Sequence, residues 1–141
     1  MIRVLIADDH PFVLAGVAEL MKAAPDIELV GECTDGAEVV RLADALEPDI
    51  IVMDGDMPVQ SGFEATRQLL PRHPRLRVII LSVSMITGGG PEAAARSGAV
   101  GYVLKGQPGH LVDAVRAVAA GGTAWPPDFT PWPDQPAGLL R

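Results

Sequence analysis

The stretch DIIVMDGDMP, residues 49–58, holds a short apolar run that ends in acidic residues and a proline. An apolar run without polar alternation is typical of a strand that is covered on both faces, as in a parallel sheet. Similar runs recur along the chain, so that five strands are expected, at residues 2–7, 27–33, 49–53, 77–82 and 100–104.

Amphipathic segments lie between these runs. Apolar residues such as Leu14, Val17 and Met21 recur at helical spacing, and similar stripes occur within residues 39–46 and 111–119. Strands that alternate with helices are typical of an α/β fold in which right-handed crossovers place helices on both faces. The sequence therefore predicts a doubly wound, five-stranded parallel sheet.

The composition fits one domain with a short appendage. The chain has 141 residues, 48% of them apolar, which suffices for one core. Its net charge of −7 repels nucleic-acid phosphates, so these residues are not expected to bind DNA directly. The single cysteine, Cys33, excludes an internal disulfide and fits a reducing compartment. Since neither a signal peptide nor a membrane span is recognisable, a cytoplasmic protein without membrane contact is expected.

Residues 121–141 differ in character from the rest of the chain. They contain both tryptophans and five prolines, and a stretch with so many prolines can neither continue a helix nor join the centre of a sheet. We expect a folded domain at residues 1–121 and a proline-rich linker or tail at residues 122–141. Solvated linkers are ordinarily polar, so part of this segment is expected to pack on the domain or on a second copy, or else to contact a further domain. The side chains concerned are Trp125, Phe129 and Trp132.

Polar residues stand at the carboxyl ends of the predicted strands, where open α/β sheets bind ligands. Asp8 and Asp9 follow the first strand and Asp54 follows the third. Ser82 ends the fourth strand and Lys105 follows the fifth. An aspartate in such a place is ordinarily a turn or cap residue, and a lone lysine is ordinarily solvated. The order of the set and its shared edge favour a common site over coincidence.

A common site of this kind predicts phosphoryl chemistry. Clustered carboxylates repel one another unless a cation compensates, and Mg²⁺ prefers hard oxygen ligands of this type. A carboxylate beside Mg²⁺ can attack a phosphoryl group and form an acyl phosphate. Lys105 would neutralise charge on the phosphoryl oxygens, and the Ser82 hydroxyl would hydrogen-bond one of them. His10, which precedes Pro11 at a helix start, is expected to be structural.

Five motifs are specific in combination: ADDHP (7–11), VGECTDG (30–36), DIIVMDGDMP (49–58), GFEATR (62–67) and GAVGYVLK (98–105). Together they resemble the receiver domains of bacterial two-component response regulators of the NarL/FixJ subfamily, over about residues 1–121. The resemblance implies a flavodoxin-like (CheY-like) (βα)5 receiver fold.

The resemblance also implies roles for the carboxylates. Asp54 resembles the phosphoryl acceptor of the family. Asp9 and Asp54 resemble direct Mg²⁺ ligands, and Asp8 resembles a ligand that acts through water. The backbone carbonyl of Asp56 resembles the third protein ligand.

Three further residues receive roles in the same way. Ser82 and Lys105 resemble the pair that contacts the phosphoryl group, and Tyr102 resembles the aromatic switch residue that turns inward on activation. By this resemblance a sensor histidine kinase donates the phosphoryl group, and the domain catalyses its own phosphorylation and slow dephosphorylation. It would work as a signalling switch and not as a metabolic enzyme.

The subfamily ordinarily continues into a helix-turn-helix output domain, which this chain lacks. Because residues 121–141 resemble an interdomain linker, a piece of a transcription factor is favoured over a stand-alone receiver. DNA would then be contacted only through that output domain. Pairing into a homodimer stays open.

Some features depart from the subfamily pattern. Gly55 stands where a larger apolar residue is usual, Asp56 adds a carboxylate, and the glycines at 88–90 predict a mobile loop before a short helix at 91–97. Because of these differences, an alternative function stays open, in which the domain is an interaction module that works without phosphorylation. A haloacid-dehalogenase-type phosphatase is the enzyme alternative, because Asp54-x-Asp56 superficially matches its acidic pair. In that family the nucleophile lies on the first strand of the sequence. Here the pair Asp8-Asp9 follows the first strand, and Asp54 follows only the third.

Overall fold

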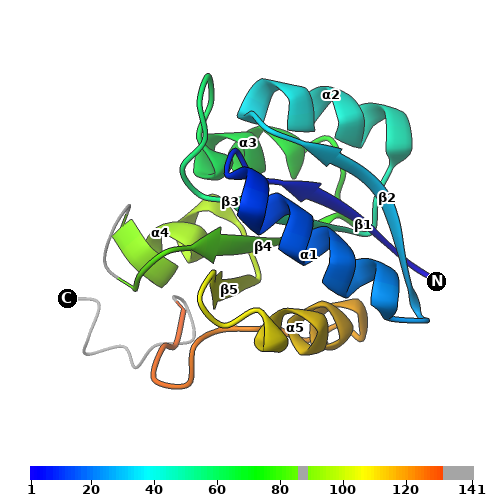
Figure 1. Cartoon of the computed structure of the whole chain (residues 1–141). Coiled ribbons are helices and arrows are strands. Elements are labelled where there is room, and N and C mark those ends of the chain that lie inside the picture. The colour runs from blue at the N-terminus through cyan, green and yellow to red at the C-terminus, as the bar shows by residue number, and fades with distance from the viewer. Residues whose placement is uncertain (86–88, 132–141) are drawn as a thin grey trace.

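The computed structural model describes residues 1–85 and 89–131. Five parallel strands form one sheet in the order β2-β1-β3-β4-β5, and a helix follows each strand (Figure 1). The doubly wound, CheY-like sheet predicted from the sequence is confirmed. In chain order the elements are β1 (Ile2–Ala7), α1 (Pro11–Ala23), β2 (Ile27–Cys33), α2 (Gly36–Leu46), β3 (Ile50–Asp54), α3 (Gly62–Leu69), β4 (Arg77–Ser82), α4 (Gly90–Ser97), β5 (Gly101–Leu104) and α5 (Gly109–Ala119).

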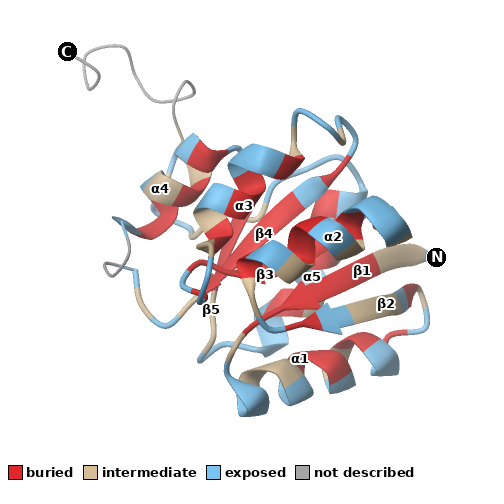
Figure 2. Ribbon diagram, turned by 90° about the horizontal axis from the view of Figure 1, so that it is seen from above, coloured by how far each residue is buried: buried red, intermediate tan, exposed pale blue. Residues whose placement is uncertain are grey.

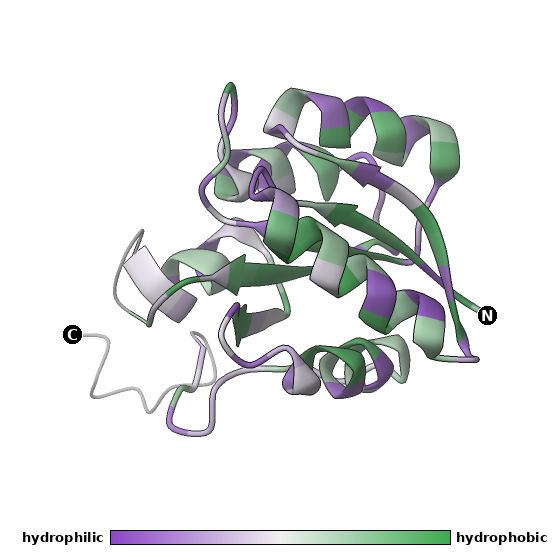
Figure 3. Cartoon of the chain, in the orientation of Figure 1, coloured by the Kyte–Doolittle hydropathy of each residue, from purple (hydrophilic) through white to green (hydrophobic). Residues whose placement is uncertain are grey.

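Helices cover both faces of the sheet. Side chains of α1 and α5 pack with one set of buried strand residues, and those of α2, α3 and α4 pack with the other set. Figure 2 shows buried residues on the sheet and on the helix sides that face it. The strands are largely apolar (Figure 3), because both of their faces are covered. Among the described residues, no helix is long and apolar enough to cross a membrane.

Polar side chains fix where two of the helices begin. The Asp35 carboxylate accepts a hydrogen bond from the backbone N–H of Glu38 (2.8 Å) at the start of α2. The Ser61 hydroxyl accepts one from the N–H of Glu64 (3.2 Å) at the start of α3. Each bond satisfies an N–H that has no partner within its helix. These two caps therefore set where the loops after β2 and β3 end and the following helices begin.

Element boundaries differ slightly from the expected ones. β3 runs one residue later, so that Asp54 is its last residue instead of the first residue after it. α4 begins at Gly90, one residue before the approximate start at 91 and no earlier than the glycines at 88–90 allow. The φ of Gly90 is 62°, a left-handed conformation that favours glycine. A Cβ at Gly90 would also overlap the carbonyl oxygen of Met85. The mobility of the glycine loop stays a prediction, because residues 86–88 lie outside the described part of the chain.

Part of the proline-rich segment lies along the edge of the sheet. Ala124 forms a single parallel bridge with Gly101 of β5, and its N–H donates to the carbonyl of Val100 over 2.9 Å. The Trp125 side chain packs against the buried residues on the α4 side of the sheet. The expected packing of this segment on its own domain is thus confirmed for Trp125, while Trp132 lies outside the described residues. We call residues 123–129 the strap.

The single cysteine is a buried structural residue. Cys33 ends β2 with 3% of its surface exposed, and its Sγ lies 3.8 Å from the carbonyl oxygen of Ile6. Burial raises the pKa of the Cys33 thiol to about 12. The thiol is therefore protonated and unreactive at physiological pH.

Candidate phosphoryl-acceptor site

The sheet register brings the predicted site residues to one edge. β1 lies beside β3, with Ala7 opposite Met53, so Asp8 and Asp54 follow at neighbouring positions. On the other side of β3, Asp54 lies opposite Leu81, which directly precedes Ser82. The arrowheads of β1 and β4 point to the same side of the molecule in Figure 1. The carboxyl ends of these strands therefore meet at a common rim, as predicted.

Three aspartates and a histidine form a compact cluster at this rim. One ligand atom from each of Asp8, Asp9, His10 and Asp54 lies within 4.8 Å of the others. Asp8 is 0% exposed and Asp54 is 3% exposed. Three oxygens here, Asp8 Oδ2, Asp9 Oδ1 and Asp54 Oδ2, are buried without a hydrogen-bond partner of good geometry. Buried anionic oxygens need a compensating cation, and the carboxylate oxygens of the three aspartates are hard ligands of the kind that Mg²⁺ prefers.

Lys105 supplies one positive charge to the cluster. Its Nζ lies 2.9 Å from Asp8 Oδ2 and 3.0 Å from Asp54 Oδ2, as ion pairs, and its side chain is 6% exposed. Burial disfavours the ammonium, but the two carboxylates outweigh burial and raise the pKa of Lys105. Lys105 therefore stays protonated at neutral pH, directly beside the Asp54 carboxylate.

Asp54 is a carboxylate with reduced acidity. Burial raises its pKa to about 6, with Asp8 adding to the rise. The backbone N–H of Asp56, which donates to Asp54 Oδ1 over 3.1 Å, and Lys105 act in the opposite direction. At pH 7 the group is mostly ionised, as a nucleophile must be. The Asp56 side chain is exposed, so the extra carboxylate noted in the sequence is not buried with the others.

Ser82 and Tyr102 meet at a shared acceptor beside the cluster. The Ser82 hydroxyl donates to the backbone carbonyl of Ser84 over 3.0 Å. The Tyr102 hydroxyl donates to the same carbonyl over 2.5 Å. Tyr102 is only 3% exposed, so its ring points inward. Neither hydroxyl is paired with the acidic side chains in this arrangement.

His10 is the site residue that the sequence did not reveal. Its Nδ1 lies 3.0 Å from Asp8 Oδ1, 3.2 Å from Asp9 Oδ1 and 3.1 Å from Lys105 Nζ. Its backbone N–H also donates to Asp8 Oδ1 over 2.8 Å, which supports the structural role expected at the start of α1. Only its position directly after the acidic pair hinted that its ring would lie at the rim.

The phenyl ring of Phe63 explains how Gly55 is accommodated after the acidic strand end. A Cβ added to Gly55 would lie 2.9 Å from Cζ of Phe63. The Phe63 ring, from the first turn of α3, thus fills the space that a larger residue at position 55 would take. Phe63 thus compensates for the missing side chain at position 55, and the acidic cluster is not disturbed by the glycine.

The sequence is similar to known signalling proteins. It matches the family model described as the response regulator receiver domain over residues 4–116. The transcriptional regulatory protein LiaR of Bacillus subtilis (strain 168) is 42% identical over 122 residues, which are 86% of this chain and 57% of LiaR. The nitrate/nitrite response regulator protein NarL of Escherichia coli (strain K12) is 37% identical over 134 residues, which are 91% of this chain and 59% of NarL. The chain therefore spans little more than half the length of these relatives.

Solved structures agree with the sequence matches. A two-component response regulator of the LuxR family from Aurantimonas sp. SI85-9A1 superposes with a TM-score of 0.82 at 36% identity, over 89% of this chain and 90% of that one. The receiver domain of the putative regulator NarL from Mycobacterium tuberculosis gives a TM-score of 0.79 at 30% identity, over 85% and 97% of the two chains. The chain belongs to the family of response regulator receiver domains, the signalling switches of two-component systems, and is related to those of NarL- and LuxR-type regulators.

Proposed function

We propose that Asp54 accepts a phosphoryl group from a phosphohistidine of a sensor histidine kinase. The observation that carries this proposal is the Asp54 carboxylate at the end of β3, 3% exposed and 3.0 Å from the Lys105 ammonium. A carboxylate oxygen of Asp54 attacks phosphorus, and an O–P bond forms as the N–P bond to the imidazole breaks. The imidazole leaves as a neutral base after taking a proton from solvent. Asp54 then carries an acyl phosphate.

Lys105 and Ser82 assist this transfer in different ways. Lys105 is already in place to neutralise negative charge on the transferred oxygens. The Ser82 hydroxyl must leave the Ser84 carbonyl before it can donate to a phosphoryl oxygen. The proposed capture of the phosphoryl group therefore requires a rearrangement at Ser84.

The acidic cluster is the proposed place for Mg²⁺. Asp9 and Asp54 would bind the ion directly, Asp8 through water, and Asp56 through its backbone carbonyl. The support for this assignment is the excess of negative charge at the cluster, where three aspartates meet a single lysine ammonium. Mg²⁺ bound there supplies positive charge to the phosphoryl oxygens in transfer. We further propose that the domain catalyses both its own phosphorylation and its slow dephosphorylation.

The whole protein is proposed to control transcription from the cytoplasm. LiaR and NarL are named as regulators, and both extend well beyond the part that this chain matches. A DNA-binding output domain after the proline-rich segment at residues 122–141 would then contact DNA, while the acidic receiver would not. A homodimer would present two such domains to DNA.

Acetyl phosphate with Mg²⁺ tests the acceptor. The intact-protein mass of the wild type should rise by one phosphoryl group, and Asp54→Asn should abolish the rise. Asp113→Asn is the control, because this carboxylate on α5 is exposed, lies outside the acidic cluster and should leave labelling intact. An unmodified wild type would support an interaction module that works without phosphorylation. Turnover of small phosphate esters would instead support the phosphatase alternative.

A further inference from the structure

A ring nitrogen lies among the carboxylates of the acidic cluster. His10 Nδ1 is 3.0 Å from Asp8 Oδ1, 3.2 Å from Asp9 Oδ1 and 3.5 Å from Asp54 Oδ2. The ring therefore approaches all three aspartates through one atom. The structural role of His10 at the start of α1 uses its backbone N–H and does not account for this placement of the ring.

Lys105 indicates which tautomer of the ring lies in the cluster. Its Nζ is 3.1 Å from His10 Nδ1. A lysine ammonium can only donate hydrogen bonds, and the raised pKa of Lys105 keeps it protonated at neutral pH. The contact is favourable when Nδ1 is the acceptor and Nε2 carries the ring proton, whereas the other tautomer would set an N–H against the ammonium. The lone pair of Nδ1 then points into the cluster.

The separations between these atoms match those of ligands around one metal ion. Bonds of about 2.1 Å place neighbouring ligand atoms about 3.0 Å apart at a right angle and about 3.4 Å apart at the tetrahedral angle. His10 Nδ1 lies 3.2 Å and 3.5 Å from the oxygens of Asp9 and Asp54, the two side chains proposed above as direct ligands. Acceptor atoms this close repel one another, and a cation bound between them removes that repulsion.

The ring can be reached from solvent, and its backbone is fixed. The His10 side chain is 55% exposed, so an ion can approach without opening the fold. The backbone N–H donates to Asp8 Oδ1 over 2.8 Å, and Pro11, whose φ is restricted by its own ring, begins α1 directly afterwards. A ligand that is held in place before binding loses little freedom when the ion binds.

We propose that His10 Nδ1 is a direct ligand in the acidic cluster and makes the site select Zn²⁺ over Mg²⁺ more strongly than the aspartates alone would. The inference rests on the metal site proposed above and adds one residue to it. Imidazole nitrogen is a good ligand for Zn²⁺, whereas Mg²⁺ prefers oxygen and keeps several waters. Mg²⁺ therefore retains a water at the place where Zn²⁺ takes the ring. Zn²⁺ competes with Mg²⁺ for the phosphoryl-acceptor site.

Calorimetric titrations of the protein with Zn²⁺ and with Mg²⁺ test this selection. In His10→Ala the Zn²⁺ affinity should fall at least roughly tenfold, because loss of a group that only orients a metal ligand already costs about that much. The Mg²⁺ affinity should stay within about twofold of the wild type, because water replaces the ring. The variant keeps the backbone hydrogen bond to Asp8 and loses a side chain that is largely exposed, so it should fold. Equal losses for the two ions would overturn the selection.

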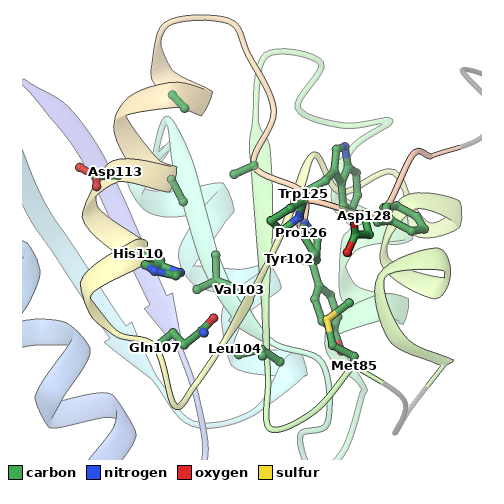
Figure 4. A pocket seen from close by; sticks show the side chains of 15 residues that line it. Met85, Tyr102, Val103, Leu104, Gln107, His110, Asp113, Trp125, Pro126 and Asp128 are labelled. Atoms are coloured by element: carbon green, nitrogen blue, oxygen red, sulfur yellow. The ribbon is translucent and has the colours of Figure 1, made fainter.

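The other two histidines of the chain serve as controls. His110 lies on α5 at one side of a cavity that the strap also lines, outside the acidic cluster (Figure 4). His73 Nε2 lies 2.7 Å from Asp44 Oδ1, so it meets one carboxylate where His10 meets three. His73→Ala and His110→Ala should keep the wild-type Zn²⁺ affinity. If either control loses Zn²⁺ affinity and His10→Ala does not, Zn²⁺ binds elsewhere and the inference is wrong.

The ring nitrogens give a second readout, by NMR of protein with ¹⁵N-labelled histidine. Equimolar Zn²⁺ should shift His10 Nδ1 and leave the rings of the two controls in place, while Mg²⁺ should cause no such shift. If both ions bind and Asp9→Ala weakens each, but the His10 nitrogens do not respond to Zn²⁺, then His10 is not a ligand and the proposed metal site stands. If binding of neither ion depends on Asp9, the proposed metal site fails together with the inference.

Discussion

Without divalent ions, the Asp54→Asn variant is expected to be more stable than the wild type at neutral pH. The wild type must keep an ionised carboxyl in a site that is 3% exposed. The pKa of Asp54 rises from 3.8 to about 6 on folding, which corresponds to roughly 3 kcal/mol in favour of the protonated form. Asparagine carries no charge into the site, and Lys105 keeps Asp8 as its partner.

The sign of the pH dependence follows from the raised pKa. The folded wild type holds the Asp54 proton more tightly than the unfolded chain does, so its stability falls as the pH rises from 3.8 to about 6. The variant lacks this titration. The free energy of unfolding of Asp54→Asn should therefore match that of the wild type below pH 3.8. It should exceed the wild-type value by roughly 3 kcal/mol above the folded pKa of about 6. Mg²⁺ should reduce the advantage, because bound cation stabilises the wild-type carboxylates.

Urea denaturation in EDTA, repeated from about pH 4 to about pH 8, measures this difference. The free energy of unfolding is compared between wild type, Asp54→Asn and the control Asp56→Asn. The Asp56 side chain is exposed, so its removal should give no comparable gain. A stability difference for Asp54→Asn that is constant over the whole series would refute the argument from burial.

Two further substitutions test the site and its support. Asp9→Ala should weaken Mg²⁺ or Mn²⁺ binding in a titration more than Asp8→Ala, because Asp9 is the proposed direct ligand; equal affinities in both variants and the wild type would sink the assignment. Gly55→Val should collide with Phe63, whose Cζ lies 2.9 Å from the position of a Cβ, and should cost about 1–3 kcal/mol in urea denaturation. Adding Phe63→Leu should recover part of that loss, and a purely additive double variant would speak against direct contact.

The order of the elements and the site edge followed from the sequence because both rest on local patterns. Each strand is a short apolar run, and each strand end carries its polar residue at a fixed place in the chain. Parallel strands then bring Asp8, Asp54 and Lys105 together without further information. The acidic cluster was predictable for that reason. The contacts of Lys105 with both carboxylates were not, because they depend on the conformation of the lysine side chain.

Three features had little or no local signal in the sequence. The single bridge of Ala124 to β5 involves one residue and so leaves no periodic pattern. The Phe63 ring fills the space at Gly55 across a loop, which residue spacing does not encode. The place of the His10 ring depends on how the first turn of α1 is held by Asp8. All three depend on tertiary contacts, whereas secondary-structure propensities describe each segment by itself.

The buried thiol of Cys33 has a practical consequence for spectroscopy. The chain contains no other cysteine, and this one is 3% exposed with its pKa raised to about 12. Maleimide and iodoacetamide reagents, which attack thiolates, will therefore pass over the native protein. A cysteine introduced at an exposed position, such as Thr123 on the strap, would take a fluorophore or spin label at one place only, without removal of the natural residue.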